Sequence, residues 1–263
     1  MFKLDYHLHT NFSSDSSINP EYLICKAINQ NYNEIVITDH FDLNPIDIKN
    51  YGLLNLDDYT KTIDDLKTKY KEQIIIKKGL EVGEYHQYIK KIDDIINKND
   101  YEVIIGSIHR TEKNINMSIP VDNPFDKSAI NSYYKANLEM VKSGMIDVLG
   151  HLGIFQRYYP EYANIEDYYN IIDSIFNYMK LNNIALEINF SGLRKPIGNL
   201  IPSIGIIKKY INNGGNLLTI GSDLHSLNEM KDSFYNKAIK MLKDNGINFL
   251  SRKHNGQWNN IKI

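Results

Sequence analysis

The chain lacks the features that would place it outside the cell, in a membrane or on nucleic acid. Cys25 is its single cysteine, so no internal disulfide can form and a reducing cytoplasm is expected. No run approaches the ~18 apolar residues of a membrane span, and residues 1–10 carry neither part of a secretory signal, so we expect a soluble protein. The formal net charge of -2 gives no electrostatic reason to bind nucleic acid or an anionic membrane.

Signatures of covalent and nucleotide-dependent catalysis are also missing. The chain has no GxSxG nucleophile motif and no GxxxxGK[ST] phosphate loop, and no phosphate-binding loop surrounds Cys25. A protein nucleophile is therefore not indicated. Arginine is scarce, so each arginine carries more weight as a candidate anion ligand. The four are Arg110, Arg157, Arg194 and Arg252.

Apolar runs alternate with longer segments of helical period, which is typical of βα units around a parallel sheet. Strands are predicted at residues 3–9, 34–38, 73–81, 101–109, 145–150, 184–190 and 216–220, with a short last strand at 247–250. Helices are predicted at residues 19–30, 56–70, 86–97, 126–143, 165–181, 203–212 and 228–245. Seven βα units and a remnant of an eighth indicate an α/β fold, a distorted (β/α)7 barrel of TIM type, with residues 1–263 as a single domain.

Nine imidazole and carboxylate side chains fall near the carboxyl ends of these strands. They are His7, His9, Asp15, His40, Glu81, His109, His151, Asp223 and His225. The carboxyl ends of barrel strands meet at one rim, and the i, i+2 spacing of His7/His9 and of Asp223/His225 turns each pair to one face of an extended chain. One histidine at a strand end is more often a hydrogen-bonding residue than a ligand. Six at one rim, with three carboxylates, exceed what one ion needs and predict a multinuclear metal site.

The motifs HLH (His7, His9), TDH (His40), a glutamate ending the third strand (Glu81), SIH (His109), GH (His151) and SDLH (Asp223, His225) follow one another along the chain. This series resembles the polymerase-and-histidinol-phosphatase (PHP) family of metal-dependent phosphoesterases over essentially the whole chain. The resemblance implies two to three divalent ions, Zn, Fe or Mn. It implies that His7, His9, Glu81 and Asp223 hold one ion, that Glu81, His109 and His151 hold a second, and that Asp15, His40 and His225 hold a third. Several family members have a histidine where this chain has Asp15, and a carboxylate can also ligate.

By the same resemblance, Glu81, Asp223 and His225 are the expected catalytic residues. Two divalent ions about 3.5 to 4 Å apart can share and deprotonate a water, which supplies a hydroxide nucleophile near neutral pH. A dianionic phosphate also favours nearby guanidinium groups. Arg157 and Arg194 follow the fifth and sixth strands and are expected to bind the substrate phosphate, with a surface ion pair as the alternative. Arg110 is a weaker candidate for binding the substrate, and Arg252 is expected to be structural.

The resemblance is closest to the histidinol-phosphatase branch, which implies a metal-dependent phosphomonoesterase acting on L-histidinol phosphate in histidine biosynthesis. Alternatives are a PHP-type protein-tyrosine phosphatase, a nucleic-acid phosphodiesterase or exonuclease, which would need a basic groove, and a non-catalytic metal-binding module. We expect a small-molecule partner and neither nucleic acid nor membrane; the sequence does not indicate an oligomeric state. Asp39 could orient His40 or cap a turn, Asp42 could shape the pocket, and His86 and His254 are expected to be surface histidines.

Overall fold

The computed structural model describes residues 2–263 apart from the side chain of Asn97; Met1, the first residue of the predicted domain, lies outside them. The strands are β1 (Leu4–Leu8), β2 (Glu34–Ile37), β3 (His40–Asp42), β4 (Ile75–Gly83), β5 (Val103–Ser107), β6 (Val148–Leu149), β7 (Ala185–Asn189), β8 (Leu218–Gly221), β9 (Phe249–His254) and β10 (Gln257–Lys262). The α-helices are α1 (Pro20–Asn29), α2 (Pro45–Tyr51), α3 (Leu56–Tyr70), α4 (Ile89–Asn99), α5 (Lys127–Lys142), α6 (Tyr169–Leu181), α7 (Ile204–Asn212) and α8 (Asp232–Asp244). Short 3-10 helices are η1 (Tyr85–Gln87), η2 (Ile154–Gln156), η3 (Glu166–Tyr168), η4 (Ser191–Arg194) and η5 (Leu227–Glu229).

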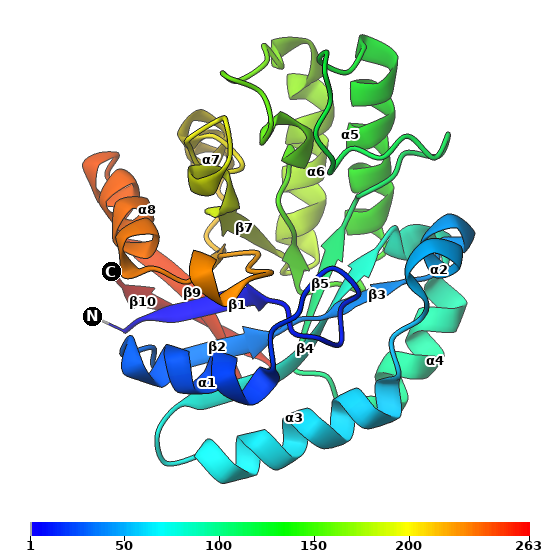
Figure 1. The fold of residues 1–263 in the computed structure, drawn as a ribbon. Coiled ribbons are helices and arrows are strands. Elements are labelled where there is room, and N and C mark those ends of the chain that lie inside the picture. The colour runs from blue at the N-terminus through cyan, green and yellow to red at the C-terminus, as the bar shows by residue number, and fades with distance from the viewer. Residues whose placement is uncertain (1) are drawn as a thin grey trace.

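Parallel strands form a nearly closed barrel with helices around it (Figure 1). The strand order is β1-β2-β4-β5-β6-β7-β8, and β3 pairs with β4 beyond the end of β2. The first and last barrel strands meet at their carboxyl ends, where Leu8 bridges Leu224 and the His9 N–H donates to the Leu224 carbonyl at 3.1 Å. The predicted single-domain α/β fold, a distorted seven-stranded barrel, is confirmed.

Apolar runs and helix-capping residues in the sequence account for the positions of the barrel strands and of the helices around them. Every residue of β1, β2, β5, β7 and β8 is buried, as expected of parallel strands covered on both faces. Helix α1 begins at the predicted Asn19–Pro20, and the Asn19 side chain accepts from the N–H groups of Glu21 and Tyr22. These elements hold the loops that follow the strands at one rim. No helix within residues 2–263 has the length and apolar character that a membrane crossing requires.

The C-terminal segment is not a barrel strand, so the predicted remnant of an eighth βα unit at 247–250 is wrong. Strands β9 and β10 pair antiparallel, joined through Asn255 and Gly256, whose positive φ angles of 48° and 75° suit a tight hairpin turn. The hairpin packs at the amino end of the barrel, where Arg252 Nε donates to Glu34 at 2.9 Å. Arg252 is therefore structural, as expected.

Other elements differ from prediction in their bounds. The strand expected at 145–150 pairs regularly only at Val148–Leu149, the helix expected at 86–97 begins at Ile89, and the last helix begins at Asp232 instead of 228. Neither α2 nor β3 was predicted from the sequence. Helix α2 starts after Asn44 at Pro45, the same signal that starts α1, and it ends at Tyr51, before Gly52, which has a φ of 81°.

Candidate metal centre

All nine predicted ligands lie together at the carboxyl rim of the barrel. His7 lies in β1 and His9 directly after it, Asp15 in the loop before α1, His40 in β3, Glu81 in β4, His109 and His151 after β5 and β6, and Asp223 and His225 after β8. Loops following parallel strands meet at this rim because the barrel strands share one direction. The structure thus gathers residues that span more than two hundred positions of the chain.

The Glu81 carboxylate stands at the middle of this group. It is fully buried, and its Oε2 lies 3.1 Å from His7 Nε2, 3.4 Å from His9 Nε2 and 3.1 Å from His40 Nδ1. Its Oε1 lies 3.3 Å from His109 Nε2 and 2.9 Å from His151 Nε2. One carboxylate therefore faces five imidazoles, the arrangement expected of a ligand shared between ions.

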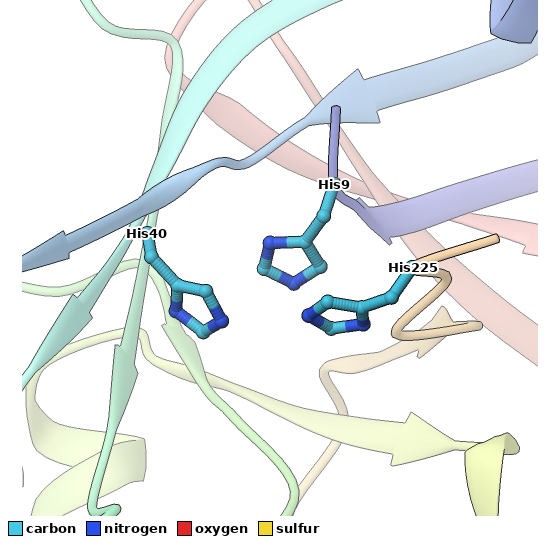
Figure 2. A group of neighbouring side chains, drawn as sticks. All are labelled: His9, His40 and His225. Atoms are coloured by element: carbon cyan, nitrogen blue, oxygen red, sulfur yellow. The ribbon is translucent and has the colours of Figure 1, made fainter. Parts of the chain in front are cut away.

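A second part of the group surrounds His9. Figure 2 shows the rings of His9, His40 and His225 pointing toward one another from three separate segments, and the His9 and His225 rings stack with centroids 4.1 Å apart. Asp15 Oδ2 lies 3.2 Å from His225 Nε2 and 3.6 Å from His40 Nε2. Half of the Asp15 side chain remains exposed, which places it at the open side of the site.

The loop that carries Asp223 and His225 is not extended, so the predicted reason for their proximity is wrong. Asp223 has a φ of 53°, in the left-handed region that non-glycine residues seldom occupy. The turn still brings His225 Nδ1 to 3.5 Å from Asp223 Oδ1. Such backbone strain at a cluster of functional side chains is typical of ligand sites.

Among the described residues, four sets of side chains present ligand atoms close enough to share an ion. They are His7, His9 and Asp223; His7, Glu81 and His151; His9, His40 and His225; and His40, Asp42 and His109. The first three overlap the sets implied by the family resemblance, with His7 joining the second and His9 the third. The fourth set includes Asp42, which was predicted from the sequence only as a residue that could shape the pocket.

The donor set fits divalent transition metals. Buried atoms without a hydrogen-bond partner include Nε2 of His7, His9 and His225 and Oε2 of Glu81. Buried polar atoms are almost always paired, so several unpaired ones facing each other indicate that a cation completes their coordination. Imidazole nitrogen and carboxylate oxygen are donors that bind Zn, Fe and Mn in proteins.

The electrostatics of the site keep its carboxylates ionised. Burial raises the pKa of Glu81, but the imidazoles of His7, His40 and His109 outweigh it and hold that pKa well below its usual value. The pKa of Asp223 is likewise held low, because His9, His7 and Arg157 offset its burial. Burial, reinforced by His225 and His40, keeps the pKa of His9 well below its ordinary value. Ionised carboxylates and a neutral imidazole are the forms that bind metal.

A cavity of about 360 Å³ opens over the centre, within the size range of small-molecule sites. Asp15, His40, His109, His151, Asp223 and His225 form part of its wall, together with Arg157. Arg157 Nη1 donates to Asp223 Oδ2 at 2.7 Å, and Nη2 donates to the Ser118 carbonyl at 3.0 Å. Phe12, Leu53 and Ile119 add an apolar part to the wall.

The other candidate arginines lie elsewhere. Arg194 Nη2 donates to the carbonyls of Ser222 and Asp223 at 2.8 and 3.1 Å, behind the Asp223 side chain, and Arg194 is not part of the cavity wall. Arg110 forms a buried ion pair with Asp47 of α2, which indicates a structural role. The structure thus places only one of the two predicted phosphate-binding arginines on the cavity.

Three further acidic or polar residues support the ligands. Asp39 accepts from Thr10 and from Ser13, and Ser13 Oγ in turn lies 3.2 Å from His9 Nδ1. Glu187 of β7 lies 2.6 Å from His7 Nδ1 and was missed, although an ionisable residue inside the apolar run IALEINF was a visible signal.

The two remaining histidines were predicted to lie at the surface. His254 is exposed, as expected for a surface residue. The surface prediction is wrong for His86, which is half-buried with both ring nitrogens shielded.

A parallel α/β barrel whose carboxyl rim gathers imidazoles and carboxylates around a cavity has the architecture of a metal-dependent barrel enzyme. Residues 5–191 match the PHP domain family, and the chain belongs to this family. It is 32% identical over 253 residues to the "Probable histidinol-phosphatase" of Clostridium acetobutylicum, covering 91% of this chain and 92% of that protein. It is 29% identical over 234 residues to the "Histidinol-phosphatase" of Lactococcus lactis, covering 86% and 85%.

A solved structure gives the corresponding comparison in three dimensions. The histidinol phosphate phosphatase of Lactococcus lactis, crystallised with zinc, L-histidinol and phosphate, superposes with a TM-score of 0.82. The match has 27% sequence identity and covers 98% of both chains. The likeness therefore extends past residue 191, through the segment that carries Arg194, Asp223 and His225.

Proposed function

We propose that this chain is a metal-dependent phosphomonoesterase that hydrolyses L-histidinol phosphate to L-histidinol and phosphate, a step of histidine biosynthesis. The observation that carries the proposal is the nine-residue centre around Glu81, in a barrel that matches a zinc-containing histidinol phosphate phosphatase along 98% of its length. The names of the curated relatives support the same substrate.

The centre is proposed to hold two to three ions of Zn, Fe or Mn. The ligands are His7, His9, Asp15, His40, Glu81, His109, His151, Asp223 and His225, with Glu81, Asp223 and His225 as the catalytic residues in contact with the ions. When bound, the ions supply an activated water and neutralise phosphoryl charge. Zinc is supported by the solved relative; Fe and Mn are supported by the donor types alone.

Arg157 is proposed to bind the substrate phosphate from the cavity wall. Its side chain is 15% exposed, and its guanidinium is held in place by Asp223 and Ser118, so little side-chain freedom is lost when a phosphate binds. Arg194 would act indirectly, since its hydrogen bonds to the carbonyls of Ser222 and Asp223 stabilise the left-handed turn at Asp223. A direct contact of Arg194 with phosphate stays a prediction.

The remaining expectations concern the extent of the protein and its surroundings. We propose that residues 1–263 act as one PHP-type unit, because Asp223 and His225 complete a site that begins at His7. A cytoplasmic location is supported by the single cysteine. A cavity of about 360 Å³ favours a small phosphomonoester over a protein phosphotyrosine or a nucleic-acid strand, and the net charge of -2 supports the same choice.

The test is a phosphate-release screen of the purified protein loaded with Zn or Mn. The substrates are L-histidinol phosphate, other small phosphomonoesters, a phosphotyrosyl peptide and a single-stranded oligonucleotide. We expect the highest kcat/KM for histidinol phosphate. A higher kcat/KM for the peptide or the oligonucleotide would replace the proposal with the corresponding alternative.

A further inference from the structure

Glu187 is a buried carboxylate on β7 whose two oxygens meet three hydrogen-bond donors. Its Oε1 lies 2.6 Å from His7 Nδ1. Its Oε2 accepts from the backbone N–H of His151 at 2.5 Å and from Asn189 Nδ2 at 3.2 Å. Glu187 is fully buried and does not line the cavity, so it is not placed to contact a substrate there.

We propose that Glu187 is a positioning residue that fixes two histidines of the metal centre at once. By accepting a hydrogen bond from His7 Nδ1, it holds the proton on that nitrogen and leaves the lone pair on Nε2, which faces Glu81 at 3.1 Å and Asp223 at 3.9 Å. By accepting from the His151 N–H, it anchors the loop after β6 that carries the second imidazole. The inference rests on the proposed function only in assigning a metal to this site.

The chemistry of the contacts requires a carboxylate here. The backbone N–H and the carboxamide NH₂ can only donate at these contacts, and His7 must donate from Nδ1 if Nε2 is to bind metal. A glutamine would turn its own NH₂ toward either His7 or His151. An NH₂ group facing His7 would donate to Nδ1 and favour the tautomer protonated on Nε2, in which Nε2 cannot bind a metal. An NH₂ group facing His151 would place two donors, itself and the backbone N–H, against each other.

Gly221 of β8 provides the space for this pair. A Cβ at position 221 would overlap Glu187 Oε1 and lie 2.5 Å from His7 Cβ. Gly221 pairs in register with Asn189, so the space lies directly between the strand that carries Glu187 and the end of β1. An alanine at position 221 would therefore force the Glu187 carboxylate and the Cβ of His7 to move, and so would disturb their hydrogen bond from a third strand.

Two other ring nitrogens of the centre have a neutral oxygen as their hydrogen-bond partner, and the nearest carboxylate oxygen to His109 Nδ1, from Asp42, is 3.9 Å away. His9 Nδ1 lies 3.2 Å from Ser13 Oγ, and His225 Nδ1 lies 3.1 Å from the Asp223 carbonyl. A neutral acceptor polarises an imidazole less than an ionised carboxylate does, so the His7 ring receives stronger support as a donor to a cation. Loss of Glu187 should therefore weaken metal binding at the sites that include His7.

The test compares E187Q with G221A and with E34Q as a matched control. Glu34 is also fully buried, but it pairs with Lys77 and Arg252 at the opposite end of the barrel. The affinity of each protein for Co²⁺ alone is measured from the visible absorption of the ion in competition with a chelator. The thermal midpoint of the metal-free protein is measured in parallel, and long-range ¹H–¹⁵N spectra of the Zn-loaded protein report the tautomer of His7.

We expect E187Q and G221A to bind Co²⁺ about 10- to 100-fold more weakly, while E34Q lowers the thermal midpoint and keeps the wild-type affinity. At saturating metal, E187Q should lower kcat for histidinol phosphate and leave KM unchanged, because Glu187 touches no substrate. A folded E187Q with wild-type Co²⁺ affinity and the Nδ1-protonated tautomer would overturn the inference. If E187Q does not fold, the affinity of G221A decides.

The readout separates this inference from the proposed function. Weak Co²⁺ binding by E187Q in a protein that releases no phosphate from histidinol phosphate would reject the substrate and retain the role of Glu187. Full activity of the wild type, with unchanged metal affinity in both variants, would reject the role of Glu187 and retain the substrate.

Discussion

Replacing Arg157 by alanine removes a guanidinium that lines the cavity beside the proposed ligand Asp223. The side chain is 15% exposed and donates to Asp223 Oδ2 and to the Ser118 carbonyl, while its Nε is buried without a partner. A hydrogen bond to a charged group contributes about 1.5 to 3 kcal/mol, and 1.4 kcal/mol corresponds to a factor of ten. If Arg157 binds phosphate as proposed, loss of one such bond should lower kcat/KM by about 10- to 150-fold, with KM rising.

R157K and R252A serve as controls for this prediction. Lysine keeps the charge but not the fork of donors, so R157K should lose less than R157A. Arg252 pairs with Glu34 at the far end of the barrel, so R252A should keep the wild-type kcat and KM. Phosphate release and metal content are measured on the same preparations, because Arg157 contacts Asp223. An R157A protein with full metal content and kcat/KM within about twofold of wild type would refute the role assigned to Arg157.

Three further predictions address the hairpin, pH and the metal. E34A leaves the buried Lys77 ammonium without its carboxylate, so the free energy of unfolding measured in urea should fall by about 3 to 5 kcal/mol, while kcat stays unchanged. A loss below about 1 kcal/mol would contradict the packing of the hairpin. Burial raises the pKa of Tyr210 to about 12, so the folded state holds the phenolic proton more tightly than the unfolded state does. This difference contributes about 3 kcal/mol to the free energy of unfolding below pH 10, and the contribution is lost as the pH rises through 12. Y210F should remove that part of the alkaline loss of stability in denaturation series, and equal pH dependence in both proteins would count against it. Chelation should abolish phosphate release and Mn or Zn should restore it, whereas an unchanged rate after metal removal would exclude the proposed chemistry.

Local signals in the sequence predicted most of the barrel. Helix α1 starts where Asn19 and Pro20 indicate, and β7 lies within the predicted strand at 184–190. The same kind of signal was present but not used at Asn44–Pro45, where the short helix α2 begins, and at Asn255–Gly256, which turns the final hairpin. The docking of that hairpin could not be predicted, because it depends on contacts between residues more than two hundred positions apart, such as Arg252 with Glu34.

Site residues at the ends of predicted strands could be identified from the sequence, whereas features of the site that depend on tertiary contacts could not. The expectation that the carboxyl ends of barrel strands meet at one rim was enough to locate the imidazoles around Glu81, because it requires only the strand bounds. It could not reveal that Asp223 adopts a left-handed conformation, nor that Arg194 lies behind that residue instead of on the cavity. The acid inside the apolar run IALEINF was a signal of a buried carboxylate, but its partner His7 could not be identified from the sequence, because only the tertiary fold brings β7 near β1.

We propose that Glu81 joins imidazoles from along the chain around more than one cation. Anomalous diffraction from crystals of the zinc-loaded protein tests it most directly, because the peaks locate each ion independently of the protein density. We expect at least two peaks, with one oxygen of Glu81 at each of two ions and the nitrogens of His7 and His151 within coordination distance. A single peak away from Glu81, or no peak at saturating zinc, would contradict it.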